Sequence, residues 1–403
     1  MPNPKIHPAI LLSPVENGYV AYDPVSDRLH QLNPLAALLA ELCDGSRSVD
    51  EVRALVAPLL PGGKAGEVDR WIDEGIKAGL LTANDDASQT ARSLSAEELY
   101  NLAKRLEDNG KVQTAFLCAK RAVEMKPDFW DAWYDLGDLG QSVGRREEAR
   151  EAYQKYFDVH PEDAELEHLL VALRDEAPPP RASDRTIQQI YKGFAVTYET
   201  RMREDLQYQG PERIRDAIVS VIGQPAGLNV LDLGCGSGLS GIVLKPWAAH
   251  LLGVDLSPEM IELARKREIY DQLEVAEITA WLGDATEPFD LIVSCDVIIY
   301  FGDLHQIVEA ASKRLKAGSL FALSMERSER FPYHLTDTGR YAHHPDHVRE
   351  VAGAAGLSVA YLDEAFLRME YGVPVTGLFA VLKKQDRVGI VPTCADRLSQ
   401  GDA

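Results

Sequence analysis

The C-terminal half of the chain alternates short, nearly continuous apolar runs with stretches in which apolar residues recur every three to four positions. The first pattern is typical of strands buried on both faces, and the second of amphipathic helices. The clearest helical stretches are Glu259–Arg267 and Leu304–Leu315. The runs that we interpret as strands are Asn229–Leu233, His250–Asp255, Leu273–Ile278, Phe289–Asp296, Ser319–Glu326, Leu357–Met369 and Val375–Lys383. This half of the chain therefore predicts an α/β domain.

The middle of the chain repeats itself with an offset of 34 residues, counted from residue 96 to residue 130. Matching positions carry apolar, small or helix-ending residues: Leu99 and Trp133, Leu102 and Leu136, Gly110 and Gly144, Ala115 and Ala149, and Pro127 and Pro161. This period and pattern resemble tetratricopeptide repeats, which are antiparallel helix pairs. The resemblance implies a short helical array over residues 94–176, with Ala164–Leu173 as a capping helix. The array would serve either as a peptide- or protein-binding groove or as a rigid spacer between domains.

Residues 1–84 predict a small winged-helix-like unit. Tyr19–Pro24 and Arg28–Asn33 indicate a β-hairpin around a turn. Three helices follow in the pattern: one after the Asn33-Pro34 start signal, one opened by the capping box Ser48–Glu51, and one around Val68–Ala78.

The string L-H-Q-L-N-P, L-C-D-G-S-R-S-V-D-E-V and I-K-A-G-L-L in this unit closely resembles PqqD-like peptide-recognition domains. That family binds the leader peptides of ribosomally made natural products. The resemblance implies that a peptide adds as a strand to the exposed sheet edge, beside the third helix. The candidate contact residues are Arg28, Leu29, His30, Leu32 and Trp71. The alternative is a degenerate winged helix used for dimerisation or domain packing. Acidic second and third helices disfavour a DNA-binding winged helix.

The run from Asn229 to Gly238 carries the clearest chemical signal. A strand ends with an acid, Asp232, and three glycines then follow at every second position. Glycine permits positive φ and lets a ligand lie against the backbone. The spacing alone also fits a dinucleotide fingerprint, with a pyrophosphate on the helix N-terminus. A second strand, however, ends in Asp255, where a carboxylate suits two ribose hydroxyls, and Asp232 can face a ligand ammonium.

The pair D-L-G-C-G-S-G and V-D-L-S-P-E-M resembles class I S-adenosylmethionine-dependent methyltransferases. The resemblance implies a Rossmann-like, seven-stranded, doubly wound domain with an antiparallel closing strand over residues 186–384. It also implies that S-adenosyl-L-methionine is the cofactor. The cofactor-binding candidates are Asp232, Gly234, Cys235, Gly236, Gly238, Asp255, Leu256, Met260, Glu277, Ile278 and Cys295.

The aromatic-spaced segment Gln188–Glu199 resembles the N-terminal lid of methyltransferases that are fused to tetratricopeptide repeats. In those proteins the lid covers the methionine end of the cofactor, so Tyr191 and Tyr198 are further cofactor candidates. The alternative is that these aromatics form ordinary amphipathic-helix core. The preceding residues, 177–185, are rich in proline and predict a stiff, extended linker. Residues 385–403 predict a poorly ordered tail.

Length and composition narrow the class of protein. A chain of 403 residues fits two or three domains, so we expect a multidomain α/β protein. A net charge of -21 argues against a nucleic-acid partner, because phosphate binding depends on clustered Lys and Arg. No apolar stretch is long enough to span a membrane, and the N-terminus lacks signal-peptide features. Five cysteines without paired spacing indicate a reducing, cytoplasmic location and no metal site. A homo-oligomer is compatible with these features.

Methyl transfer from a sulfonium is an in-line displacement, so the protein mainly positions the nucleophile and supplies a base where that nucleophile carries a proton. The catalytic candidates are His343, whose imidazole titrates near neutral pH, with Tyr341 and Tyr300. Arg340 and Glu326 are substrate-binding candidates, and Arg340 could hold a substrate carboxylate bidentately. The alternative is that Arg340 simply pairs with Glu326 or Asp337.

We therefore expect a methyltransferase that modifies a peptide or protein recruited by its N-terminal domain. The substrate would be brought in by a leader peptide if the PqqD-like resemblance extends to function. One alternative is a small-molecule methyltransferase whose N-terminal half serves assembly. Another is a scaffold protein that binds S-adenosylmethionine without turnover. The methylated atom stays open among oxygen, nitrogen and carbon.

Overall fold

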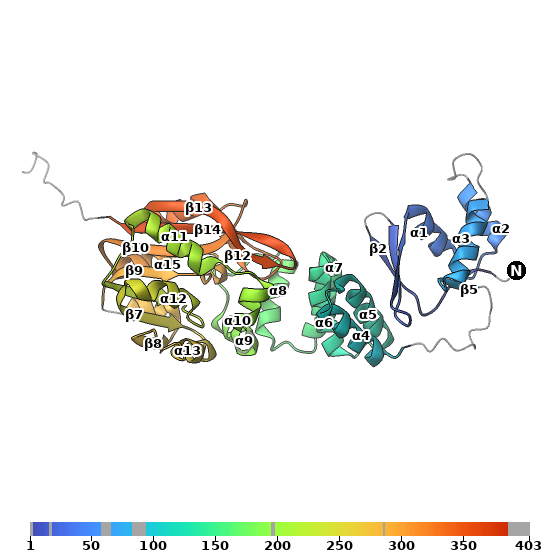
Figure 1. Cartoon of the computed structure of the whole chain (residues 1–403), viewed down its shortest axis with the longest axis horizontal. Helices are drawn as coiled ribbons and strands as arrows, with labels where there is room; N and C mark the ends of the chain where they lie inside the picture. Colours follow the sequence, from blue (N-terminus) through green and yellow to red (C-terminus); the bar gives the residue numbers. More distant parts are fainter. Residues whose placement is uncertain are drawn as a thin grey trace, which may run out of the picture. The chain divides into compact units, whose positions relative to one another are not determined.

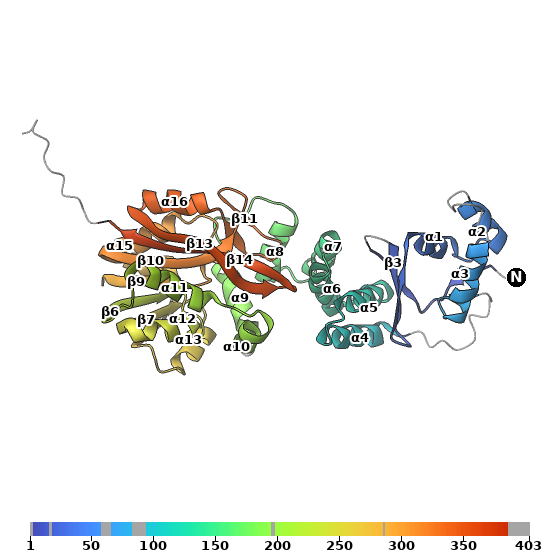
Figure 2. The same cartoon turned by 45° about the horizontal axis from the view of Figure 1, so that its top comes forward.

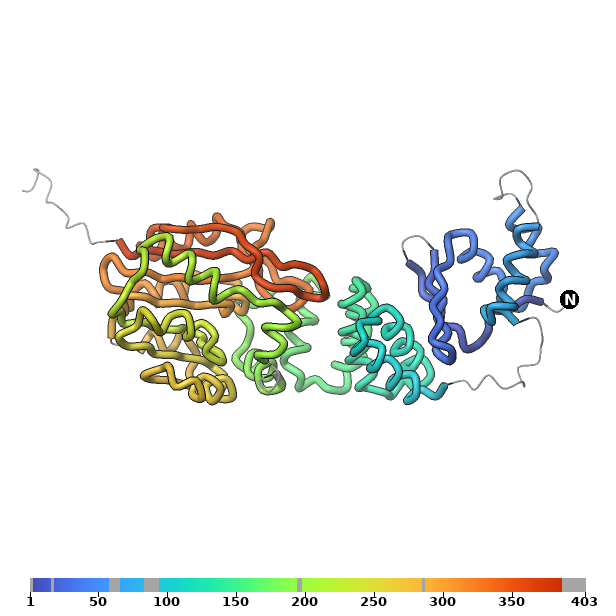
Figure 3. The backbone as a smooth tube through the Cα atoms, in the orientation of Figure 1, coloured from blue at the N-terminus to red at the C-terminus, as the bar shows by residue number. Residues whose placement is uncertain are grey.

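A computed structural model describes residues 3–15, 18–57, 66–82, 94–194, 198–284 and 287–385 (Figures 1 and 3). The chain divides into two compact units, Met1–His160 and Pro161–Ala403. Each unit is described by itself. The predicted tail, residues 385–403, lies outside the described residues except for Gln385.

The N-terminal unit begins with short strands and three helices. Strands β2 (Leu11–Val15), β3 (Gly18–Asp23) and β4 (Arg28–Leu32) form an antiparallel sheet in that order, and β1 (Lys5–Ile6) pairs with β5 (Leu81–Thr82). The helices are α1 (Pro34–Leu42), α2 (Val49–Val56) and α3 (Gly66–Lys77). The cap side chains expected from the sequence are present, since Asn33 accepts from the Ala36 N–H and Ser48 and Glu51 form a capping box.

Two helical hairpins complete this unit. They are α4 (Ala96–Asp108) with α5 (Val112–Met125), and α6 (Trp130–Ser142) with α7 (Arg146–Phe157). Each helix of the second hairpin begins 34 residues after its counterpart in the first, as the sequence period predicts. Small residues bring the helices close: an added Cβ at Gly137 on α6 would lie 2.3 Å from the Tyr153 ring on α7. This contact makes the second hairpin sensitive to a single methyl group.

We expect Gly137→Ala to destabilise the second hairpin by about 1–3 kcal/mol, because the ring of the buried Tyr153 has no space to move away. Alanine's helix propensity, about 1 kcal/mol better than that of glycine, offsets part of this loss. Urea unfolding followed by circular dichroism measures it. Gly66→Ala is the control, because no atom lies within 4 Å of its added Cβ. Equal stability of the two variants would show that the close approach carries no cost.

The C-terminal unit is a doubly wound sheet (Figure 2). Its hydrogen-bonded strand order is β8-β7-β6-β9-β10-β14-β13, with β14 antiparallel to both of its neighbours. The bounds are β6 (Leu228–Leu233), β7 (Ala248–Asp255), β8 (Gln272–Val275), β9 (Phe289–Ser294), β10 (Leu315–Arg327), β13 (Leu357–Glu370) and β14 (Val373–Lys384). The helices are α8 (Ala164–Leu173), α9 (Asp184–Phe194), α10 (Tyr198–Thr200), α11 (Gly210–Ile222), α12 (Leu239–Leu244), α13 (Pro258–Arg265), α14 (Ile278–Asp284), α15 (His305–Arg314) and α16 (Pro345–Ala354).

Each face of this sheet has its own core. Val230 belongs to the cluster that contains residues of α11 and α12, whereas its neighbour Leu231 belongs to the cluster that contains residues of α14, α15 and α16. Successive side chains of a strand point to opposite faces, so a continuous apolar run contributes side chains to both cores. Because β6, β7 and β9 are parallel, their carboxyl ends lie at the same edge of the sheet, where the loops that follow them meet.

Three expectations about this unit need correction. The sheet has nine strands in the described part of the chain instead of seven, because β11 (Tyr333–Leu335) and β12 (Tyr341–His343) add a hairpin beside β10. The third strand ends at Val275, and Ile278 opens α14. Helix α8, expected to cap the repeats, lies in the C-terminal unit, where His168 Nε2 lies 3.0 Å from the Gly339 carbonyl oxygen.

The proline-rich segment is not an exposed linker along its whole length. The Pro180 carbonyl accepts hydrogen bonds from the Gly302 and Asp303 N–H groups, and the Ala182 N–H donates to the Tyr300 carbonyl. The Tyr341 hydroxyl donates to the Pro179 carbonyl at 2.6 Å. The segment is thus hydrogen-bonded to residues 300–303, which follow β9. Arg181 lines the same pocket as the glycine-rich loop.

Candidate functional site

The loop between β6 and α12 presents bare backbone. Gly234, Gly236 and Gly238 all have positive φ, at 77°, 52° and 87°. A Cβ at Gly234 would lie 2.3 Å from Val297, so no side chain fits there. At Gly236 the nearest atom to an added Cβ is the Tyr198 hydroxyl oxygen at 4.0 Å, so a side chain would project into open space. The loop therefore lets a ligand approach the main chain, as the glycine pattern predicts.

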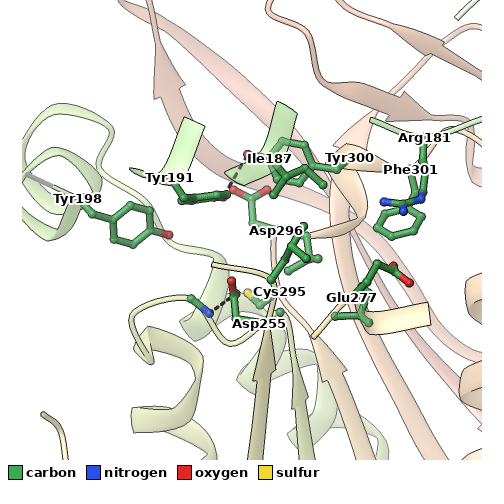
Figure 4. A pocket seen from close by; sticks show the side chains of 15 residues that line it. Arg181, Ile187, Tyr191, Tyr198, Asp255, Glu277, Cys295, Asp296, Tyr300 and Phe301 are labelled. Atoms are coloured by element: carbon green, nitrogen blue, oxygen red, sulfur yellow. Dashed lines mark hydrogen bonds between the residues drawn. The ribbon is translucent and has the colours of Figure 1, made fainter. Parts of the chain in front are cut away.

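Asp255 closes β7 and holds this loop. One of its carboxylate oxygens accepts from the Gly236 N–H at 2.8 Å, and the other accepts from the Ser257 N–H at 2.9 Å. Burial raises the pKa of Asp255, while these backbone hydrogen bonds oppose the shift. Each carboxylate oxygen can accept a second hydrogen bond, and Asp255 lines a cleft (Figure 4). The arrangement can receive two neighbouring hydroxyls.

The cleft encloses about 580 Å³ that no atom fills, part of it open to solvent. Its lining comes from the strand ends, the helices that precede β6, and the segment after β9. The lining residues are Arg181, Ile187, Tyr191, Tyr198, Gly234, Gly236, Asp255, Leu256, Glu277, Ile278, Cys295, Asp296, Val297, Tyr300 and Phe301. A pocket at the carboxyl ends of parallel strands, where loops diverge, is the usual ligand site of doubly wound sheets.

The segment before β6 covers one side of this cleft. Tyr191 on α9 and Tyr198 on α10 have ring centroids 6.2 Å apart, and the Tyr300 hydroxyl donates to that of Tyr191 at 3.1 Å (Figure 4). Arg267 links this segment to the glycine-rich loop, because it pairs with Glu199 and donates to the Ser237 carbonyl in the loop. The two predicted lid tyrosines thus lie at the cleft.

The comparison with protein families agrees with this geometry. Residues 225–372 match the family model described as "Methyltransferase domain". This stretch of the chain is a methyltransferase domain. Enzymes with such domains take their methyl group from S-adenosylmethionine, and the residues of the cleft fit that cofactor. The bare loop, the free acceptor sites of Asp255 and the aromatic lid suit its amino-acid portion, its ribose and its sulfonium, respectively.

Similar proteins match parts of the chain. A "Ubiquinone biosynthesis O-methyltransferase" of Xylella fastidiosa is 33% identical over 108 residues, which are 26% of this chain and 44% of that protein. A "Magnesium-protoporphyrin O-methyltransferase" of Rhodobacter capsulatus is 26% identical over 150 residues, covering 35% of this chain and 66% of that protein. The structure of magnesium protoporphyrin IX methyltransferase from Synechocystis with bound SAH is 18% identical, with a TM-score of 0.40, and covers 50% of this chain and 100% of that chain. The chain thus spans less than half of the first relative.

Asp232 lies behind the cleft of the methyltransferase domain, not in its wall. Its carboxylate accepts hydrogen bonds from the Tyr270 hydroxyl at 2.6 Å and from the Ser240 hydroxyl at 2.8 and 2.9 Å. Burial raises its pKa to about 6, although these hydrogen bonds oppose the shift. Asp232 is fully buried, so the expectation that it faces a ligand ammonium is not met. Its carboxylate instead ties β6 to α12 and to the chain before β8.

The other predicted cofactor residues divide into two groups. Those that line the cleft are Gly234, Gly236, Asp255, Leu256, Glu277, Ile278, Cys295, Tyr191 and Tyr198. Those that do not are Cys235, which lines a smaller neighbouring pocket, Gly238, and Met260, which is fully buried in α13. Sequence reasoning missed Arg181, Ile187, Asp296, Val297 and Phe301. Asp296 had a usable signal, because it follows the β9 strand as Asp255 closes β7.

The predicted general base is wrong. His343 is fully buried on β12, and the residue does not line the cleft. Burial, with the nearby His347, lowers its pKa to about 3. Tyr341 is also fully buried and holds Pro179. Of the three catalytic candidates, Tyr300 alone lines the cleft, and burial raises its pKa.

The predicted substrate residues also lie elsewhere. Arg340 pairs with Glu370, and Glu326 pairs with Arg368, so both lie in an ion-pair network and neither lines the cleft. In the N-terminal unit, Leu32 is buried in a core cluster and Trp71 packs against it. Arg28, Leu29 and His30 lie on β4, an edge strand among the described residues, where Leu29 is 54% exposed.

The described residues contain no group of three His, Cys, Asp or Glu side chains arranged to hold a metal ion. Across the same ranges, no helix is long and apolar enough to cross a membrane.

Removal of the Asp255 carboxylate tests whether the cleft binds S-adenosylmethionine. We expect Asp255→Ala to weaken S-adenosylmethionine binding about 100-fold, because it removes the hydroxyl acceptor and releases the Gly236 N–H. Titration calorimetry measures the affinity. Asp271→Asn is the control: this carboxylate likewise accepts from a backbone N–H, that of Leu251 on β7, but does not line the cleft. Unchanged affinity in Asp255→Ala would refute this assignment.

His343 predicts a pH dependence of stability. Its folded pKa of about 3 lies below the ordinary value of 6.5, so the unfolded chain takes up the proton first. The native state should therefore lose about 1.4 kcal/mol per pH unit from this residue as the pH falls below 6.5. His343→Leu should reduce this loss, measured by denaturant unfolding at pH 7 and pH 5. Parallel losses in both proteins would contradict burial of a neutral imidazole.

Proposed function

We propose that this protein is an S-adenosylmethionine-dependent methyltransferase that modifies a peptide or protein acceptor in the cytoplasm. The observation that carries the enzymatic part is the Asp255 carboxylate, which grips the glycine-rich loop and still lines the cleft. The family match over residues 225–372 supports the same activity.

The roles of the residues follow from their positions. Asp255 would orient the ribose, the Gly234–Gly236 backbone would receive the amino-acid portion, and Leu256 and Ile278 would flank the base. Bound there, S-adenosylmethionine supplies an electrophilic methyl group. Tyr191, Tyr198 and Tyr300 would exclude water and align the acceptor, since a displacement mainly needs an in-line approach.

Recruitment of a peptide is the finer part of the proposal. Its support is the resemblance of residues 1–84 to PqqD-like domains, together with the exposed Leu29 and the position of β4 at the edge of its sheet in the part of the chain that the structure describes. An added strand would gain main-chain hydrogen bonds along Arg28–His30, and the helical repeats would extend the surface.

A small-molecule acceptor is the second candidate. It is favoured by the names of the two relatives, which are O-methyltransferases of ubiquinone biosynthesis and of magnesium protoporphyrin. Those matches cover 26% and 35% of this chain, and under this alternative the N-terminal unit serves assembly.

Mass spectrometry separates the candidates. The full chain is incubated with S-adenosylmethionine and with the short peptides encoded beside its gene, and we expect one of them to gain one methyl mass. Leu29→Glu should slow that gain by about tenfold, because it places a charge on the proposed docking edge. Val25→Glu is the matched control on the β3–β4 turn, where Val25 is 58% exposed. Methylation of small aromatic hydroxyl compounds alone would reject the peptide acceptor.

A further inference from the structure

A buried group of charges lies behind one end of the cleft. Arg368 on β13 is 1% exposed at its side chain, and its Nη1 atom lies 3.2 Å from both carboxylate oxygens of Asp296. Its Nη2 atom pairs with Glu326 and lies 3.5 Å from Glu370, which in turn pairs with Arg340. We call these five residues the charge network. Three carboxylates face two guanidinium groups, so the network has one more acidic than basic side chain.

Asp296 is the member of the network that lines the cleft. Its φ of +57° is a conformation that residues other than glycine rarely adopt. Two contacts hold it there: the backbone N–H donates to the Ser324 Oγ at 2.9 Å, and the carboxylate pairs with Arg368. A strained backbone that is fixed from two sides at a cleft points to a functional position.

Three carboxylates line the cleft in the described part of the chain: Asp255, Glu277 and Asp296. Asp255 accepts from two loop N–H groups, and Glu277 accepts from the Thr279 and Ala280 N–H groups at the start of α14. Figure 4 shows Asp296 beside Tyr191 and Tyr300, whereas Glu277 lies apart from them on the Arg181 side. With a ribose on Asp255, the base and the sulfonium extend to opposite sides, and the lid tyrosines mark the sulfonium side.

We infer that Asp296 is the carboxylate that faces the sulfonium charge of the methyl donor, and that Arg368 and Ser324 are the residues that position it. A carboxylate attracts a cation strongly at contact distance in a partly dry cleft, and aromatic faces add to the attraction. Arg368 holds the Asp296 carboxylate in place through the two contacts of its Nη1 atom. This role rests on the proposed methyl-transfer function.

The positive charge on the sulfur of the donor disappears when its methyl group is transferred to the acceptor. A bond forms between the acceptor atom and the methyl carbon, the carbon–sulfur bond breaks, and its electron pair stays on sulfur. A proton on the acceptor leaves to solvent. Asp296 then faces a neutral thioether instead of a sulfonium cation, while its ion pair with Arg368 remains. The carboxylate should therefore favour S-adenosylmethionine over S-adenosylhomocysteine, which helps the spent product to leave.

The test compares the affinities of these two ligands by titration calorimetry on the full chain. We expect Asp296→Asn to weaken S-adenosylmethionine binding about tenfold more than S-adenosylhomocysteine binding, because the amide keeps the shape but not the charge. Glu277→Gln is the matched control, since the same change on the other side of the cleft should affect both ligands equally. Equal losses for both ligands in Asp296→Asn would overturn the inference.

Ser324→Ala is a second test variant, and this substitution removes no charge. It deletes the acceptor of the Asp296 N–H, and we expect the ratio of the two affinities to shift about threefold toward equality. If Asp296→Asn does not fold by circular dichroism, an unchanged ratio in Ser324→Ala overturns the inference. If the unaltered chain binds neither ligand, the proposed function itself fails. If the unaltered chain binds both ligands and the variants leave the ratio of the two affinities unchanged, the role of Asp296 is refuted but the proposed function is not.

Discussion

The hydrogen bond from the Gly236 N–H to the Asp255 carboxylate is the contact on which the cleft depends. It joins the loop after β6 to the end of β7, and a charged acceptor makes it stronger than a neutral hydrogen bond. The same carboxylate also caps the turn before α13 through the Ser257 N–H. One partly buried side chain thereby fixes the shape of two loops while it still faces the ligand space. Burial opposes its ionisation, and the two backbone donors offset that cost.

The second constraint comes from charges that are far apart in the sequence. Asp296 follows β9, Glu326 lies on β10, and Arg368 lies on β13. The antiparallel β14 strand places β13 near β10, so the closing hairpin of the sheet brings an arginine into contact with Asp296, which lines the cleft. A buried arginine is tolerated when carboxylates surround it, and removal of one partner leaves an uncompensated charge. The closing strands thus contribute to the site as well as to the edge of the sheet.

Local patterns predicted much of this molecule. Some correct predictions depend only on residues close together in sequence. They are the ends of β6 and β7, the glycine turn, the caps at Asn33 and Ser48, and the 34-residue repeat of the helices. Asp255 was predicted as a ligand residue for the same reason. Asp232 shows the limit of such patterns, because Tyr270, 38 residues away, and Ser240 decide where its carboxylate points. His343 lies in a polar stretch of sequence, yet its pairing on β12 buries it. The proline-rich segment was expected to be a stiff linker, but hydrogen bonds to the chain after β9 hold it in place.

A crystal structure of the chain with S-adenosylhomocysteine tests the central claim most directly. The account predicts that both ribose hydroxyls lie within hydrogen-bonding distance of Asp255, while Asp232 keeps its contacts with Tyr270 and Ser240. A ligand whose ribose lies away from Asp255, or whose amino group displaces Tyr270 from Asp232, would contradict it.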